Sequence, residues 1–165
     1  MRRALPFAFL SLFLLCPSLA FGQGGNDKAA EVLAITKAGK GIVLLAGDIA
    51  LEAGKLAKGS QWTFFVQLPK AKADALRKEL DRDGLLGNRD YVQDGVASLY
   101  LSDDLADAVI VSESPGTTVP GLSEVLRVLR PEGKGLVGNK IVTKQFAKGT
   151  DEWSHPYRAP DNNPQ

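Results

Sequence analysis

The residue types that most often carry catalysis are scarce in the body of this chain. His155 is the only histidine and lies in a polar C-terminal stretch, and Cys16 is the only cysteine. A Ser-His-Asp triad, a Cys-His pair or a zinc site of several histidines therefore cannot be built within residues 26–147. The candidates that remain for chemistry are glycines and carboxylates.

The most informative glycine is Gly47. Residues 41–62 have the pattern of a strand, a tight turn and a helix, which is typical of a βα unit that binds a phosphate or nucleotide. Such loops need further small residues so that the backbone approaches the ligand, but Ile49 and Leu51 stand in those positions. A branched Ile49 would resist positive φ and crowd a ligand. We therefore favour a tight turn and helix N-cap at Gly47 and Asp48 over a surviving piece of a cofactor loop.

Gly54 and Lys55 raise the alternative of a Walker A phosphate loop. That motif requires glycine where Ile49 stands and Ser or Thr where Leu56 stands. The spacing therefore argues against a phosphate loop.

Two groups of acidic or imidazole side chains could bind a metal or act as acid and base. The first is Asp103, Asp104 and Asp107. We favour a turn and a strand entry for it. The second is Asp151, His155 and Asp161. It lies in a polar segment without preorganised geometry, which disfavours a metal site.

Helices and strands alternate along residues 26–147. Helices are expected from residue 26 or 27 to about 37 and over 48–58, 70–81 and 121–129, and strands over 42–46, 62–68 and 91–93, within 105–112 and from 135. The apolar positions expected to face the core are Ala30, Leu33, Ala34, Leu51, Leu56, Trp62, Phe64, Phe65, Ala73, Leu76, Leu80, Leu122, Val125, Leu126 and Leu129. Residues 131–133 (Pro-Glu-Gly) should stop the last helix. The sequence predicts an α/β, Rossmann-like parallel sheet of about five strands with helices on both faces.

The first 22 residues have the composition of an export signal. Arg2 and Arg3 precede an apolar run over residues 4–15, and small residues at 18–20 or 20–22 offer a cleavage site; an uncleaved anchor is the alternative. We expect a periplasmic or extracellular protein without a stable membrane span after cleavage. Cleavage removes two of 20 basic residues and none of 19 acidic ones, so the net charge becomes 18 − 19 = −1. That balance disfavours a general nucleic-acid binder.

Residues 148–165 are polar and rich in Pro and Asn, as in a linker or tail.

With these elements in order, residues 28–140 resemble the class I S-adenosylmethionine-dependent methyltransferases. The clearest match is residues 124–133, Glu-Val-Leu-Arg-Val-Leu-Arg-Pro-Glu-Gly, which is similar to the helix-to-strand segment of that fold. Asp94-Gly95, followed by Leu99, Leu101 and residues 107–111, resembles the segment that leads into strand four.

A narrower resemblance involves residues 151–155, Asp-Glu-Trp-Ser-His. They are similar to a junction in exported bacterial proteins in which a methyltransferase-like domain precedes a β-propeller of the pyrroloquinoline-quinone (PQQ)-binding type. This resemblance implies a propeller beyond this point. A fragment of a longer propeller protein is therefore one interpretation of the chain, and a propeller domain or another exported protein is the partner expected.

The methyltransferase resemblance implies where S-adenosylmethionine would bind. Gly47 matches the first glycine of the family's loop, with Asp48 beside it, and Gln67 stands near the family's ribose-binding acid. Asp94 would approach the adenine amino group, and Glu113 would lie at the carboxyl edge of the sheet, as would Ser112. Gln67 lacks the charge-assisted strength of a carboxylate.

We therefore expect no catalytic residues and no bound metal, and a methyltransferase-like structural or interaction module that is not an enzyme. Two alternatives stay open: an S-adenosylmethionine-dependent methyltransferase, and a domain that binds another small ligand at the carboxyl edge of the strands.

Overall fold

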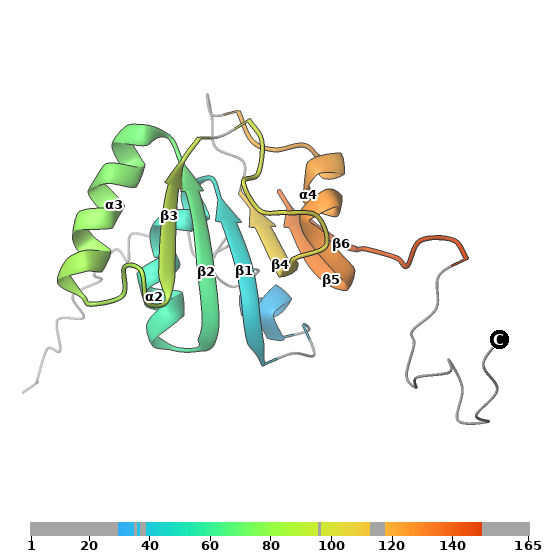
Figure 1. Cartoon of the computed structure of the whole chain (residues 1–165), viewed down its shortest axis with the longest axis horizontal. Coiled ribbons are helices and arrows are strands. Elements are labelled where there is room, and N and C mark those ends of the chain that lie inside the picture. The colour runs from blue at the N-terminus through green and yellow to red at the C-terminus, as the bar shows by residue number, and fades with distance from the viewer. Residues whose placement is uncertain (1–29, 35, 37–38, 96, 113–117, 150–165) are drawn as a thin grey trace, which may run out of the picture.

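The computed structural model describes residues 30–34, 36, 39–95, 97–112 and 118–149. Its centre is a six-stranded sheet in the order β3-β2-β1-β4-β5-β6, in which the first five strands are parallel and β6 is antiparallel (Figure 1). The strands are β1 (Lys40–Ala46), β2 (Gln61–Leu68), β3 (Asp90–Asp94), β4 (Ala106–Val111), β5 (Leu129–Val137) and β6 (Lys140–Thr143). The α/β, Rossmann-like prediction is confirmed, and β6 is an addition that the sequence pattern did not predict.

β1 and β4 are the two central strands of the sheet, and both faces of each are covered by apolar clusters. Val43 and Leu45 of β1 face one apolar cluster, while Leu44 and Ala46 face the other. A continuous apolar run is what a strand buried on both faces requires. In the first part of β2, buried and partly buried residues alternate: Trp62 and Phe64 are buried, and Phe65 is partly buried on the opposite face.

The helices form two layers on opposite faces of the sheet (Figure 1). One layer comprises helical residues 30–34, the 3₁₀ helix η1 (Asp48–Glu52), α2 (Ala53–Lys58) and α3 (Lys70–Arg82). The other contains α4 (Leu122–Val128). Ala73, Leu76 and Leu80 of α3 are buried as predicted, because positions three and four apart share a helix face.

Four inward predictions are wrong. Leu51 is 42% exposed because residues 48–52 form a 3₁₀ helix, whose tighter winding changes which positions face the sheet. Leu122 is also 42% exposed, at the first residue of α4. In the N-terminal helix Ala30 and Ala34 are exposed, and Val32 is the fully buried residue instead.

The start of β5 also differs from the prediction. α4 ends at Val128, and Leu129 already begins β5, so the Pro-Glu-Gly sequence at 131–133 lies inside the strand. Ala106 pairs with Leu129 and Ala108 with Lys134, so extra residues of β5 bulge out there. Within the bulge Glu132 has φ 64°.

Several predictions concern residues outside the described part of the chain. These are the export signal over 1–22, the tail beyond residue 149 with Asp151, Trp153, His155 and Asp161, and the candidate site residue Glu113. Among the described residues, no helix combines the length and the apolar character needed to cross a bilayer.

Candidate functional site

The predicted site residues come from the carboxyl ends of adjacent parallel strands. Gln67 pairs with Ala46, the residue before Gly47, and Asp94 pairs with Leu68. Ala46 also pairs with Val111, which precedes Ser112. The structure therefore brings Gly47, Gln67, Asp94 and Ser112 to one edge of the sheet, where ligands bind in such folds.

Gly47 is required by the chain's own packing at this edge. Its φ is 81°, and a Cβ there would lie 2.0 Å from the carbonyl oxygen of Ser112. Ser112 also donates its N–H to the Ala46 carbonyl (3.0 Å), and its Oγ accepts the N–H of Ile49 (2.9 Å). The turn after β1 is thus bonded directly to the end of β4.

Ile49 has a different role from the one expected. Its side chain is buried in the cluster between the sheet and the α2–α3 layer. Among the described residues of the turn and η1, only Gly47 has positive φ, so this backbone does not require glycine at 49 or 51. Ile49 is a core residue and does not crowd the edge.

The polar candidates at the edge are engaged inside the chain. Asp48 forms an ion pair with Lys72 of α3 (2.8 Å), and the Gly47–Asp48 turn makes no side-chain cap hydrogen bond. Asp94 forms an ion pair with Arg77 (3.3 Å). Gln67 is buried, and both ends of its amide contact the segment after β3: its Nε2 donates to the Ser98 carbonyl, and its Oε1 accepts the Tyr100 N–H (3.2 Å).

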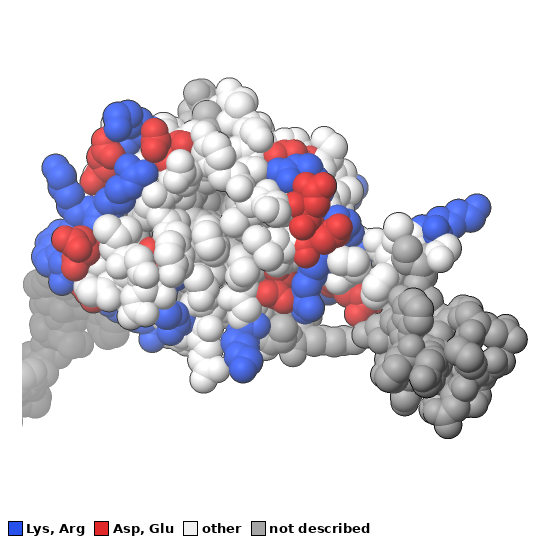
Figure 2. Space-filling model, viewed as in Figure 1, with Lys and Arg blue, Asp and Glu red and all other residues white. Residues whose placement is uncertain are grey.

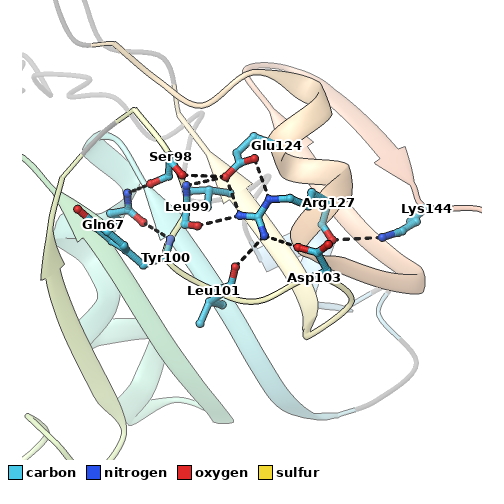
Figure 3. A network of polar contacts seen from close by, with 9 residues as sticks. All are labelled: Gln67, Ser98, Leu99, Tyr100, Leu101, Asp103, Glu124, Arg127 and Lys144. Carbon is cyan, nitrogen blue, oxygen red and sulfur yellow. Dashed lines mark hydrogen bonds and ion pairs between the residues drawn. The ribbon is translucent and has the colours of Figure 1, made fainter.

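The segment after β3 is also fixed from the other side by α4 (Figure 3). Arg127 donates to the carbonyl oxygens of Leu99 (2.8 Å) and Leu101 (3.1 Å) and to the carboxylate of Asp103 (2.6 Å). Glu124 accepts two hydrogen bonds from Arg127 and one from the Leu99 N–H (2.9 Å). Residues 98–103 are therefore connected both to β2 and to α4.

These contacts determine the charge state of the network. The Arg127 guanidinium and then the Leu99 N–H lower the pKa of Glu124 to about 2, because both bond the ionised carboxylate. Glu124 and Asp103 in turn raise the pKa of Arg127. The pair is fully charged at neutral pH, in agreement with a role in holding structure.

The acidic group at 103–107 also forms structural ion pairs. Asp103 pairs with Arg127, Asp104 pairs with Lys144 (2.6 Å), and Asp107 pairs with Arg130 (2.7 Å) while accepting the Ile42 N–H (2.8 Å). Within the described residues no three His, Cys, Asp or Glu side chains gather as a metal site would require. The turn-and-strand-entry interpretation is the one that these contacts support.

A cavity of about 470 Å³ opens beside this edge, on the face of the sheet that α4 covers only in part. Its walls include Phe65, Tyr91, Gln93 and Tyr100, and Gln67 links it to the edge. Sequence reasoning missed this cavity and the Arg127 network. The family-like motif over residues 124–133 was a signal for α4, but nothing in it indicates which carbonyl groups Arg127 contacts.

No protein-family model matches the chain, and no curated protein matches it significantly in sequence. Solved structures do match it in fold. A SAM-dependent methyltransferase from Aquifex aeolicus shares 18% identity at a TM-score of 0.50, over 64% of this chain and 60% of its own. The [4+2]-cyclase SpnF shares 21% identity at a TM-score of 0.55, over 67% and 43%.

A third match is a Methanococcus maripaludis protein provisionally described as an S-adenosyl-L-methionine-dependent methyltransferase, with 19% identity and a TM-score of 0.52 over 66% of this chain and 52% of its own. The chain spans about half the length of the first structures that it matches. At this level of identity the likeness concerns the fold alone. The chain therefore has a methyltransferase-like, Rossmann-type α/β fold.

Proposed function

We propose that this chain is a non-catalytic, methyltransferase-like module that serves a structural or interaction role in an exported protein. The observation that carries the proposal is that the side-chain amide of Gln67 is hydrogen-bonded within the chain. Its amide bonds the backbone at Ser98 and Tyr100, at the position where the resemblance would place a ribose-binding carboxylate. The group that would recognise a cofactor is engaged in holding the segment after β3.

The other edge residues fit an adenosyl cofactor poorly as well. Asp94 faces the guanidinium of Arg77, so an adenine amino group would have to compete with an ion pair. Asp48 is paired with Lys72. Gly47 is explained by its contact with Ser112, without any ligand. These engagements support a module whose edge has a structural role.

Export and a propeller partner belong to the same proposal. Their support is the basic and apolar composition of residues 1–22 and the Asp-Glu-Trp-Ser-His segment at 151–155. In this proposal the domain would adjoin a β-propeller of the PQQ-binding type or another exported protein.

A methyltransferase that uses S-adenosylmethionine is the second candidate. Two observations favour it: solved structures of similar fold include SAM-dependent methyltransferases, and the turn after β1 has a glycine at positive φ with Ile49 packed away in the core. The fold alone does not decide between the candidates, since the [4+2]-cyclase SpnF shares it.

Calorimetric titration of the full chain with S-adenosylmethionine tests the proposal. We expect no binding tighter than about 100 μM, which corresponds to about 5.5 kcal/mol. S-adenosylhomocysteine, the product of methyl transfer from this cofactor, serves as a second ligand. Binding of either compound that is tighter than this would favour the methyltransferase instead.

A further inference from the structure

Within the part of the chain that the structure describes, α4 is the helix on one face of the sheet, and the β2–β3 side of that face carries none. Residues 95 and 97–105, which belong to the segment between β3 and β4, cross this side without forming a helix. The cavity of about 470 Å³ lies there, within the size range of small-molecule sites. Figure 2 shows this area as largely uncharged, between charged residues of α3 on one side and of α4 and the adjoining loop on the other.

Aromatic rings form the walls of the cavity. Phe65 and Tyr91 stack with ring centroids 5.0 Å apart and an interplanar angle of 15°. Tyr91 is 41% exposed and Tyr100 is 63% exposed, and both line the same cavity. Exposed apolar surface that is gathered in one place is more informative of binding than single exposed side chains are. An exposed, stacked pair offers a flat surface on which another ring can pack.

Tyr100 is held in place by its surroundings. Its N–H is bonded to Gln67, and its ring lies so close to Gly95 that a Cβ there would be 2.9 Å from it. Gly95 has φ 136° and donates its N–H to the Leu68 carbonyl (2.9 Å). The exposed ring is therefore supported by a fixed backbone, as the wall of a preformed site would be.

The polar groups of the cavity are amides and phenols. The exposed side-chain amide of Gln93 lines it and makes no hydrogen bond within the described part of the chain, and none of the lining residues is charged. An ionic ligand group would lose part of its hydration here without gaining a counter-charge from the lining. A neutral ligand with one or two hydrogen-bonding groups matches this lining.

We propose that this cavity, between Tyr91 and Tyr100, binds a neutral, planar, mostly apolar small molecule. The molecule stacks on Tyr91 and bonds the Gln93 amide. The inference goes beyond the proposed function, because the site lies on the sheet face and does not depend on whether S-adenosylmethionine binds at the strand edge.

A pair of fluorescent probes tests the inference on the full chain. N-phenyl-1-naphthylamine is neutral, and 8-anilinonaphthalene-1-sulfonate has the same rings with an added negative charge. We expect saturable binding of one neutral probe per chain, and binding of the anionic probe that is weaker by about tenfold or more. A saturating concentration of S-adenosylmethionine should not displace the neutral probe.

Two pairs of variants locate the site. Gln93→Glu introduces a charge into the cavity and should weaken the neutral probe by about tenfold, whereas Gln61→Glu, the same change at an exposed position outside it, should leave binding unchanged. Tyr91→Ala should weaken binding of the neutral probe by a similar factor, and Tyr91→Phe, which keeps the ring, should retain that binding. A cooperative thermal unfolding transition in each variant serves as the control that the variant is folded.

The inference would be overturned by absence of saturable binding, by equal affinity for the two probes, or by equal effects of Gln93→Glu and Gln61→Glu. Displacement by S-adenosylmethionine would also contradict it, since the cavity would then be part of the edge site. Sedimentation analysis completes the test: a stable dimer that binds no probe would mean that a second copy covers this face.

Discussion

The guanidinium of Arg127 joins two distant parts of the chain. It donates to the backbone of residues 99 and 101 and to the carboxylates of Asp103 and Glu124, so one side chain satisfies acceptors on the loop and on α4. A planar fork with several donors is suited to this arrangement, and an ammonium group is not. The residue that organises this region is thus not one of the predicted cofactor ligands.

Arg127→Lys should therefore destabilise the domain. Lysine keeps the positive charge but cannot bond the Leu99 and Leu101 carbonyls and both carboxylates together, so we expect the free energy of unfolding to fall by about 2 kcal/mol. Urea unfolding at neutral pH measures this. Arg82→Lys at the exposed end of α3 is the matched control and should change it by less than about 0.5 kcal/mol. Equal effects of the two variants would argue against the network.

At the scale of elements, the sheet edge is closed by contacts between its own strands. The turn after β1 touches the end of β4 through Gly47 and Ser112, and the segment after β3 is bonded to β2 through Gln67. The Gly47–Ser112 contact lies between β1 and β4, where the strand order reverses and where such folds bind ligands, and the Gln67 contacts lie on the neighbouring strand. The edge is therefore held by intramolecular bonds that a ligand would have to accommodate.

Two glycine variants separate steric contact from backbone strain at this edge. Gly47→Ala should lower the free energy of unfolding by about 3 kcal/mol, because its Cβ would meet the Ser112 carbonyl oxygen and φ is 81°. Gly84→Ala has a similar φ of 69° but open space around it, so the loss should be near 1 kcal/mol. Chemical denaturation measures both, and equal losses would contradict a tight turn-to-β4 contact.

At the scale of the whole molecule, the sequence predicted the elements well where burial decides them. The apolar runs of β1 and β4 and the apolar face of α3 were found because their periodicity reflects a fixed environment. β6 was missed because its four residues are exposed or half-buried and carry no apolar pattern. The first residues of β5 were missed because Pro-Glu-Gly favours a stop, and pairing with β4 overrides that preference.

The sequence predicted where the candidate site residues lie, but not which groups they contact. Gln67 and Asp94 were correctly predicted to lie at one edge of the sheet, because they end neighbouring parallel strands and such strands share one carboxyl edge. Their partners could not be predicted, because Gln67 bonds residues more than 30 positions away and carbonyl groups leave no signal in a sequence. The cavity was missed for the same reason: its walls depend on how much of each sheet face the described helices cover.

The pH dependence of whole-domain stability should depend on Asp90, at the first residue of β3. Its carboxylate is fully buried and has no hydrogen-bond partner among the described residues; burial raises its pKa from 3.8 to about 6, while the Arg89 charge opposes this. A raised folded-state pKa contributes stability that is complete below about pH 4 and lost as pH rises through 6. Relative to Asp90→Asn, the wild-type chain should lose about 2–3 kcal/mol of unfolding free energy between pH 4 and pH 7.5. Urea unfolding across this range measures the difference, and parallel profiles would show that the carboxylate is not desolvated.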